Sequence, residues 1–171
     1  MVVNNKVLFL ISNFDKMSET ALFSIQLREI ESYFKYKDVI NREVSDVSVG
    51  WQVYHMLIVI NLVASALKRS DSKSYKKTNN KYKAKYFGAN YFPRGVANAP
   101  KFALPPETFS LKDLEQQLNR AKQSILEISE TEDNANFEHF IFGVLNKKET
   151  SKFLSIHTEH HLKIIRDILK D

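Results

Sequence analysis

The chain has 171 residues, of which 43% are hydrophobic and 26% are charged, and its formal net charge is +5 at pH 7. This composition excludes a disordered chain and fits a single globular domain spanning residues 1–171. The chain contains no cysteine, which excludes disulfide bonds, a zinc–thiolate site and a cysteine nucleophile.

Two apolar stretches bear on localisation, and both are short. Residues 7–11 are too few for the core of a signal peptide. Residues 56–67 are apolar but fall short of the roughly 20 residues that a membrane-spanning helix needs. The sequence therefore predicts a cytoplasmic protein that does not contact a membrane.

Two helices are predicted in the first part of the chain. The first runs from Asp15 or Ser18 to Tyr36, and its apolar residues recur every three or four positions. These apolar residues are Phe23, Leu27, Ile30 and Phe34. The second helix begins after Ser48, a good N-cap, and ends near Lys68. Its predicted core-facing stripe comprises Trp51, His55, Ile58, Leu62 and Ala66.

The connection after the second helix contains all four prolines of the chain, so it cannot be one continuous helix. Its first part, residues 68–94, carries nine basic residues against one acid, so the positive charge of the chain is concentrated there. A long loop in a compact domain is usually functional or mobile. We therefore expect a long crossover that includes a basic segment.

Two further helices are predicted after this crossover. The sequence SLKD at 110–113 is a capping box, and apolar residues follow it at three- and four-residue spacing. Asn146 and Glu149 form a similar box before a helix that ends near Leu169. Residues 131–145, which include EHFIFG, are expected to form a packed turn without paired strands. Four amphipathic helices and one long crossover predict an all-α four-helix bundle.

Three of the five histidines lie in HTEHHL, residues 157–162. His157 and His161 are four residues apart, so their rings share one face of the last helix and could bind one ion. His55 could add a third nitrogen if the second and last helices are neighbours, which would leave positions open for water or a substrate. This pattern indicates a catalytic site for zinc, nickel, copper or ferrous iron.

Other interpretations stay open from the residues alone. An H-x-x-x-H pair arises easily by chance, so the histidines could simply be packed or solvated. His160 could replace His161 as the partner of His157, or it could support the ligands without binding the ion. His139 could be a fourth ligand, a residue that supports the ligands, or a packed side chain. Neither Glu159 nor Glu138 can be assigned as a general base, so no catalytic side chain is identified.

Two motifs carry a family resemblance. SVGWQVYHML around His55, and HFIFG followed by HTEHHL, resemble the DinB/YfiT-like superfamily, in particular its branch with a C-terminal HxxHH signature. The resemblance implies a DinB-like four-helix bundle in which His55, His157 and His161 hold a divalent metal. Members of known activity are thiol-dependent S-transferases or isomerases that use low-molecular-weight thiols. Phe140 departs from the branch, which usually has proline there.

The leading hypothesis is a metal-dependent enzyme, a thiol-dependent S-transferase with zinc or nickel as its cofactor. Its small-molecule substrate would be an anionic low-molecular-weight thiol, attracted by the basic segment. One alternative is nucleic-acid binding, because YKKTNNKYKAKYF interleaves aromatic residues with lysines, although the rest of the chain is acidic overall. Another alternative is a non-catalytic helical scaffold. A homodimer is compatible with a bundle of this size.

Overall fold

Five α-helices and one β-hairpin form the part of the chain that the computed structural model describes, residues 19–170. The helices are α2 (Glu19–Ser32), α3 (Val49–Lys68), α4 (Lys81–Ala89), α5 (Leu111–Glu130) and α6 (Lys147–Ile168). The hairpin consists of β1 (Asn136–His139) and β2 (Gly143–Asn146). The apolar run at residues 7–11 and the predicted helix start at Asp15 or Ser18 lie outside the described residues.

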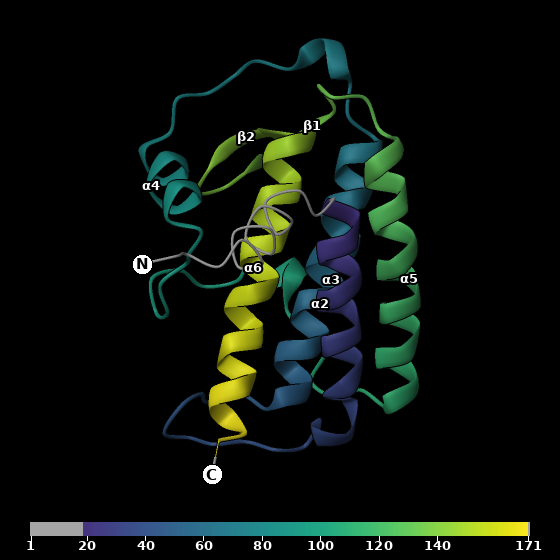
Figure 1. Cartoon of the computed structure of the whole chain (residues 1–171), viewed down its shortest axis with the longest axis vertical. Helices are drawn as coiled ribbons and strands as arrows, with labels where there is room; N and C mark the ends of the chain where they lie inside the picture. The colour runs from purple at the N-terminus through teal and green to yellow at the C-terminus, as the bar shows by residue number, and fades with distance from the viewer. Residues whose placement is uncertain (1–18, 171) are drawn as a thin grey trace, which may run out of the picture.

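The four long helices lie side by side, and α4 stands apart from them on the outer side of α6 (Figure 1). Helix α3 packs against α5 and α6, and α2 packs against the same two helices. Helices α2 and α6 run in one direction, and α3 and α5 run in the opposite one (Figure 1). The predicted helical fold is confirmed, and the contact between α3 and α6 is the neighbour relation that a shared histidine site requires.

The predicted helix starts are confirmed at three places. The Ser48 hydroxyl accepts from the backbone N–H of Trp51 and so caps α3. The boxes at the starts of α5 and α6 are complete, because each cap side chain and each N3 carboxylate accepts from a backbone N–H group. The first helix, however, ends at Ser32, four residues before the predicted end at Tyr36. The chain there tightens into a 3-10 turn, η1, over Phe34–Tyr36.

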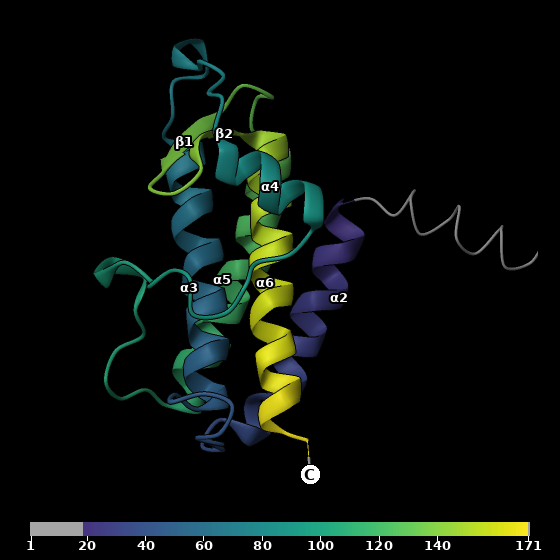
Figure 2. The same ribbon diagram turned by 90° about the vertical axis from the view of Figure 1, so that its left-hand side faces the viewer.

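The long crossover is required by the helix directions. Because α3 and α5 run the same way, the chain must return along the whole length of the bundle before α5 begins (Figure 1). On this path it forms α4 and then passes α6 toward α3, where it makes the 3-10 turn η3 (Lys101–Ala103) (Figure 2). The turn η3 contacts α3. The crossover thus reaches the two helices that carry His55, His157 and His161.

Helix α4 is an element that the sequence did not predict. It begins after Asn80, whose side chain accepts from the N–H groups of the next turn, and it ends at Asn90 with a left-handed φ of 50°. Its aromatic residues hold it in place, since Tyr86 and Phe87 both pack on Phe142 of the hairpin. A nine-residue helix rich in lysine has no apolar period to reveal it.

The prediction that residues 131–145 contain no paired strands is wrong. Strands β1 and β2 pair in antiparallel register, with Asn136 opposite Asn146 and His139 opposite Gly143. Four residues per strand are too few to show the alternation of a half-buried sheet. The hairpin is held instead by distant groups: the Asn80 amide donates to the Ile141 carbonyl, and the Lys83 ammonium donates to the Val144 carbonyl.

The core-facing stripe predicted for α3 is wrong in part. His55 is buried, but Leu62 on the same stripe is 37% exposed and Ile58 and Ala66 are only partly buried. Met56, Leu57 and Ile60, on other faces of the helix, are fully buried, among other apolar residues of α3. By length and hydropathy α3 could also cross a membrane, and 67% of its most apolar window is buried inside this fold.

Candidate metal centre

Three imidazole rings meet where α3 packs against α6. His55 comes from α3, and His157 and His161 come from consecutive turns of α6. The ring centroids are 4.6 to 5.1 Å apart, and one ring nitrogen from each residue lies within 4.8 Å of the others. His55 and His161 are buried, and His157 is partly buried. The structure therefore brings together the three histidines that the sequence singled out, in a group that could hold a metal ion.

Hydrogen bonds fix which nitrogen of two of these rings is free. The His55 Nδ1 lies 2.8 Å from the Ala103 carbonyl oxygen, and the His161 Nδ1 lies 2.6 Å from Oε1 of Gln52. A carbonyl oxygen only accepts hydrogen bonds, so each neutral ring must carry its proton on Nδ1. The Nε2 atoms of His55 and His161 are left with lone pairs, as in histidines that bind metals through Nε2.

The third ring faces the Nε2 of His161. The His157 Nε2 lies 3.2 Å from the His161 Nε2. Two bonds of 2.0–2.1 Å to one tetrahedral ion place their nitrogens roughly 3.3 Å apart, so this separation suits two ligands of one ion. The His157 Nδ1 is buried and has no hydrogen-bond partner among the described residues. The donor set and its spacing thus fit a divalent transition metal.

The surroundings of the rings keep them neutral. Burial holds the pKa of His157 and of His161 well below the usual value, and it lowers the pKa of His55. Among the described residues, the neighbouring side chains that lower these pKa values further are other histidines, and no carboxylate acts to raise them. Neutral imidazole is the form that binds metals. The three rings are therefore ready to bind an ion without first releasing protons near pH 7.

His160 points away from the three-histidine cluster. Its Nδ1 lies 2.8 Å from the Phe92 carbonyl oxygen of the crossover, while its ring only touches His161 edge to face. The alternative pairing of His157 with His160 therefore has no support in the geometry. Together with the bond from His55 to Ala103, this contact fastens the crossover to α6 and α3 beside the cluster.

His139 belongs to the hairpin. Its Nδ1 accepts from the backbone N–H groups of Ile141 and Phe142, at 3.1 and 3.3 Å. Its ring stacks on the rings of Phe140 and Phe142. His139 is thus a packed side chain that closes the turn, and of the three interpretations left open by the sequence this is the one the contacts support.

We expect His139 to make the stability of the fold depend on pH. Burial lowers its pKa to about 4, while an unfolded histidine titrates near 6.5. Between these values the unfolded chain binds the proton more readily, so stability is fully present above about pH 6.5 and falls as the pH drops toward 4. Substitution His139→Asn keeps an acceptor for the turn but removes this titration. Thermal unfolding from pH 7 to 4 should show a shallower loss in the variant, and equal slopes would contradict this role.

Sequence reasoning missed Gln52 as part of the site. Its side chain is only 4% exposed and accepts from His161. It lies three residues before His55, in a helix that is otherwise mostly apolar. A buried amide needs hydrogen-bond partners, so a lone glutamine on the packed side of such a helix was the available signal.

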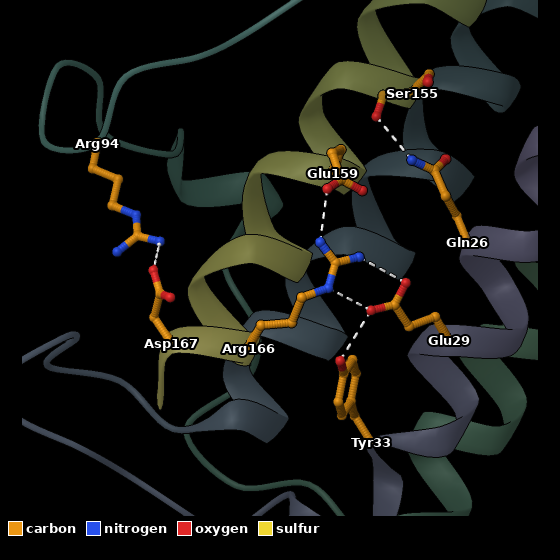
Figure 3. A network of polar contacts seen from close by, with 8 residues as sticks. All are labelled: Gln26, Glu29, Tyr33, Arg94, Ser155, Glu159, Arg166 and Asp167. Carbon is orange, nitrogen blue, oxygen red and sulfur yellow. Dashed lines mark hydrogen bonds and ion pairs between the residues drawn. The ribbon is translucent and has the colours of Figure 1, made fainter. Parts of the chain in front are cut away.

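The two acids considered as general bases do not face the cluster. Glu159 accepts from the Arg166 guanidinium at 2.8 Å, and Arg166 also binds Glu29 of α2 through two nitrogens (Figure 3). The Tyr33 hydroxyl donates to the same Glu29 carboxylate. This network ties α2 to α6. Glu138 is exposed on β1, so the structure assigns neither acid to proton transfer.

The basic segment uses part of its aromatic content for packing. Tyr86 and Phe87 contact the hairpin, and Lys83 is buried in an ion pair with Glu149 at 2.9 Å. Lys81 lies over the ring of Tyr82. A surface that stacks nucleic-acid bases needs free aromatic faces. These packed rings therefore give no support to the alternative of nucleic-acid binding.

No protein-family model, curated protein or solved structure matches this chain.

Proposed function

We propose that the protein binds one divalent transition metal, zinc or nickel, through Nε2 of His55, His157 and His161. One observation carries this proposal. Hydrogen bonds to Ala103 and Gln52 leave the Nε2 atoms of His55 and His161 without hydrogens, and among the described residues the hydrogen-bond partner of the His161 Nε2 is the His157 ring. A cation between the three nitrogens satisfies all of them at once, since each would donate its lone pair to it.

We propose further that the site is that of a metal-dependent, thiol-dependent S-transferase of the DinB/YfiT-like kind. Two motifs support this, SVGWQVYHML around His55 and HFIFG followed by HTEHHL, with the histidines on the expected helices. The chain has no cysteine, so a thiolate nucleophile would have to come from a substrate. A bound divalent ion supplies a Lewis acid that lowers the pKa of such a thiol.

The residues around the cluster favour an anionic substrate. The site offers three neutral ligands, so a divalent ion there would keep its full positive charge. Burial lowers the pKa of His160, and Arg94 and Lys163 lie near it and lower its pKa further, but Arg94 is paired with Asp167 at 2.6 Å, so Lys163 is the cation that we consider. Small thiols that carry carboxylates match this charge, and a reducing cytoplasm is the compartment that keeps them reduced.

Zinc affinity and its pH dependence test the metal site. Protein prepared without a histidine tag should bind close to one zinc per chain. Because burial lowers the pKa of all three histidines, affinity should be flat from pH 7.5 to about 6.5 and fall only at lower pH. Competition with a chromophoric chelator measures both quantities. A decline that begins near pH 7 would mean that exposed imidazoles hold the ion.

The enzymatic part needs a separate test. Zinc-loaded protein is mixed with cysteine, glutathione or coenzyme A and an alkylating acceptor. In the expected reaction the thiol loses its proton to solvent, sulfur bonds to the acceptor carbon, and the leaving group departs with its electron pair. Conjugation should be faster than with metal-free protein. Zinc-loaded protein that converts none of these thiols would favour the non-catalytic scaffold.

A further inference from the structure

Gln52 is held in one orientation by the groups on either side of it. Its Oε1 lies 2.6 Å from the His161 Nδ1, and its Nε2 donates to the Ser45 hydroxyl at 3.2 Å. Ser45 is itself fixed at the turn before α3, where its hydroxyl accepts from the backbone N–H of Val47. Ser45, Gln52 and His161 therefore form a chain of hydrogen bonds that ends at the candidate metal centre.

The orientation of this amide decides which nitrogen of His161 is free. With the oxygen toward the ring, the proton stays on Nδ1 and Nε2 presents a lone pair beside His157. If the amide were turned end for end, its N–H groups would face Nδ1 and the proton would move to Nε2. An Nε2–H group would block the position that a metal needs. The 2.6 Å contact lies just below the usual range of about 2.7–3.2 Å for N–H···O bonds, and the other end of the amide is placed to donate to the Ser45 hydroxyl.

We propose that Gln52 is a positioning residue that sets the Nδ1–H tautomer of His161 and so keeps Nε2 available as a ligand. This rests on the proposed metal site for its purpose, but its first consequence concerns the metal-free protein. Ala103 does the same for His55 through a backbone carbonyl, which no substitution can remove. Gln52 is thus the side chain at which the tautomer of a candidate ligand can be changed by mutation.

The first experiment measures the tautomer directly in metal-free protein by 15N NMR of the imidazole nitrogens. Wild-type His161 should be the Nδ1–H tautomer. In Gln52→Leu the acceptor is lost, so this tautomer should no longer dominate. In Gln52→Glu the carboxylate can only accept, so the Nδ1–H tautomer should remain. A wild-type His161 that carries its proton on Nε2 would overturn the proposal, whether or not the protein binds a metal.

The second experiment measures zinc affinity of the same variants. Loss of a residue that orients a metal-ligating histidine typically weakens binding about 10- to 100-fold, and we expect this for Gln52→Leu. Gln52→Glu should bind zinc at least as tightly as the wild type. Affinity unchanged in Gln52→Leu would overturn the positioning role. Failure of the wild type to bind zinc would instead overturn the proposed function, while the tautomer result would still decide the role of Gln52.

Gln26 provides a matched control. It is also 4% exposed and also contacts α6, but it donates to the Ser155 backbone carbonyl (Figure 3), and among the described residues it forms no hydrogen bond with a histidine. Gln26→Leu removes the same amide from an equally buried position, although the Gln26 Oε1, unlike that of Gln52, has no hydrogen-bond partner among the described residues. It should leave the His161 tautomer unchanged and zinc affinity within about twofold, in contrast to the 10- to 100-fold expected of a lost orienting contact. A loss as large as that of Gln52→Leu would mean that removing any buried amide disturbs α6, and would overturn the specific role.

Discussion

Substitution His157→Ala should abolish stoichiometric zinc binding. His157 supplies the nitrogen that lies 3.2 Å from the His161 Nε2, and without it only two imidazoles remain at the site. Losing a residue that merely orients a ligand costs about 10- to 100-fold in metal affinity, so losing a ligand should cost more than about 100-fold. Elemental analysis after dialysis measures the stoichiometry.

Tryptophan fluorescence gives an independent measurement of the same event. The chain has one tryptophan, Trp51, and its ring stacks on His55 with centroids 5.1 Å apart. Binding of a paramagnetic ion such as Ni²⁺ or Cu²⁺ at the cluster should quench this emission in the wild type. It should not do so at equal concentration in His157→Ala.

His160→Ala is the matched control, since it removes the same side chain three residues away on the same helix. His160 bonds to the Phe92 carbonyl, so its loss should loosen the crossover but leave about one zinc per chain. If His157→Ala still bound one zinc, other ligands would hold the ion. If His160→Ala lost zinc as completely, the pairing of His157 with His160 would have to be reinstated.

The parts of the site that the sequence could predict depend on local spacing. Residues four apart on a helix face the same way whatever surrounds them, so the spacing of His157 and His161 is enough to pair their rings. The caps at Ser48, Ser110 and Asn146 are also local, because each acts on the first turn that follows it.

What the sequence could not predict depends on contacts between distant segments. The hairpin is held by Asn80 and Lys83, which lie about sixty residues earlier in the chain. His139 closes its turn with a ring nitrogen, a role usually filled by Asn, Asp, Ser or Thr. Gln52 reaches His161 only because α3 and α6 are neighbours. None of these contacts leaves a periodic pattern in the sequence.

Helix α3 shows a different limit of sequence analysis. Apolar residues occur on all of its faces, so periodicity could not tell which of them is packed. The predicted stripe contains both His55 and Leu62, about two turns apart on one face. The crossover reaches this face at His55 through Ala103, while Leu62 stays 37% exposed. Residues on one face of α3 are therefore buried at one position along the helix axis and exposed at another.

Substitution Leu57→Ala should lower the free energy of unfolding by about 2–5 kcal/mol, the range found when a fully buried leucine is truncated. The Leu57 side chain is 0% exposed, and its removal leaves a cavity that the surrounding helices can fill only in part. Because the effect comes from packing, it should be the same with and without zinc. Urea denaturation of the metal-free protein measures it, with the midpoint shifting while the slope stays constant.

Leu62→Ala is the matched control in the same helix, and we expect it to cost less than about 1 kcal/mol because partly exposed sites away from special contacts tolerate truncation. The pair tests the orientation of α3, on which the candidate site depends. If Leu62→Ala were the costlier change, α3 would be packed along the whole of its predicted stripe.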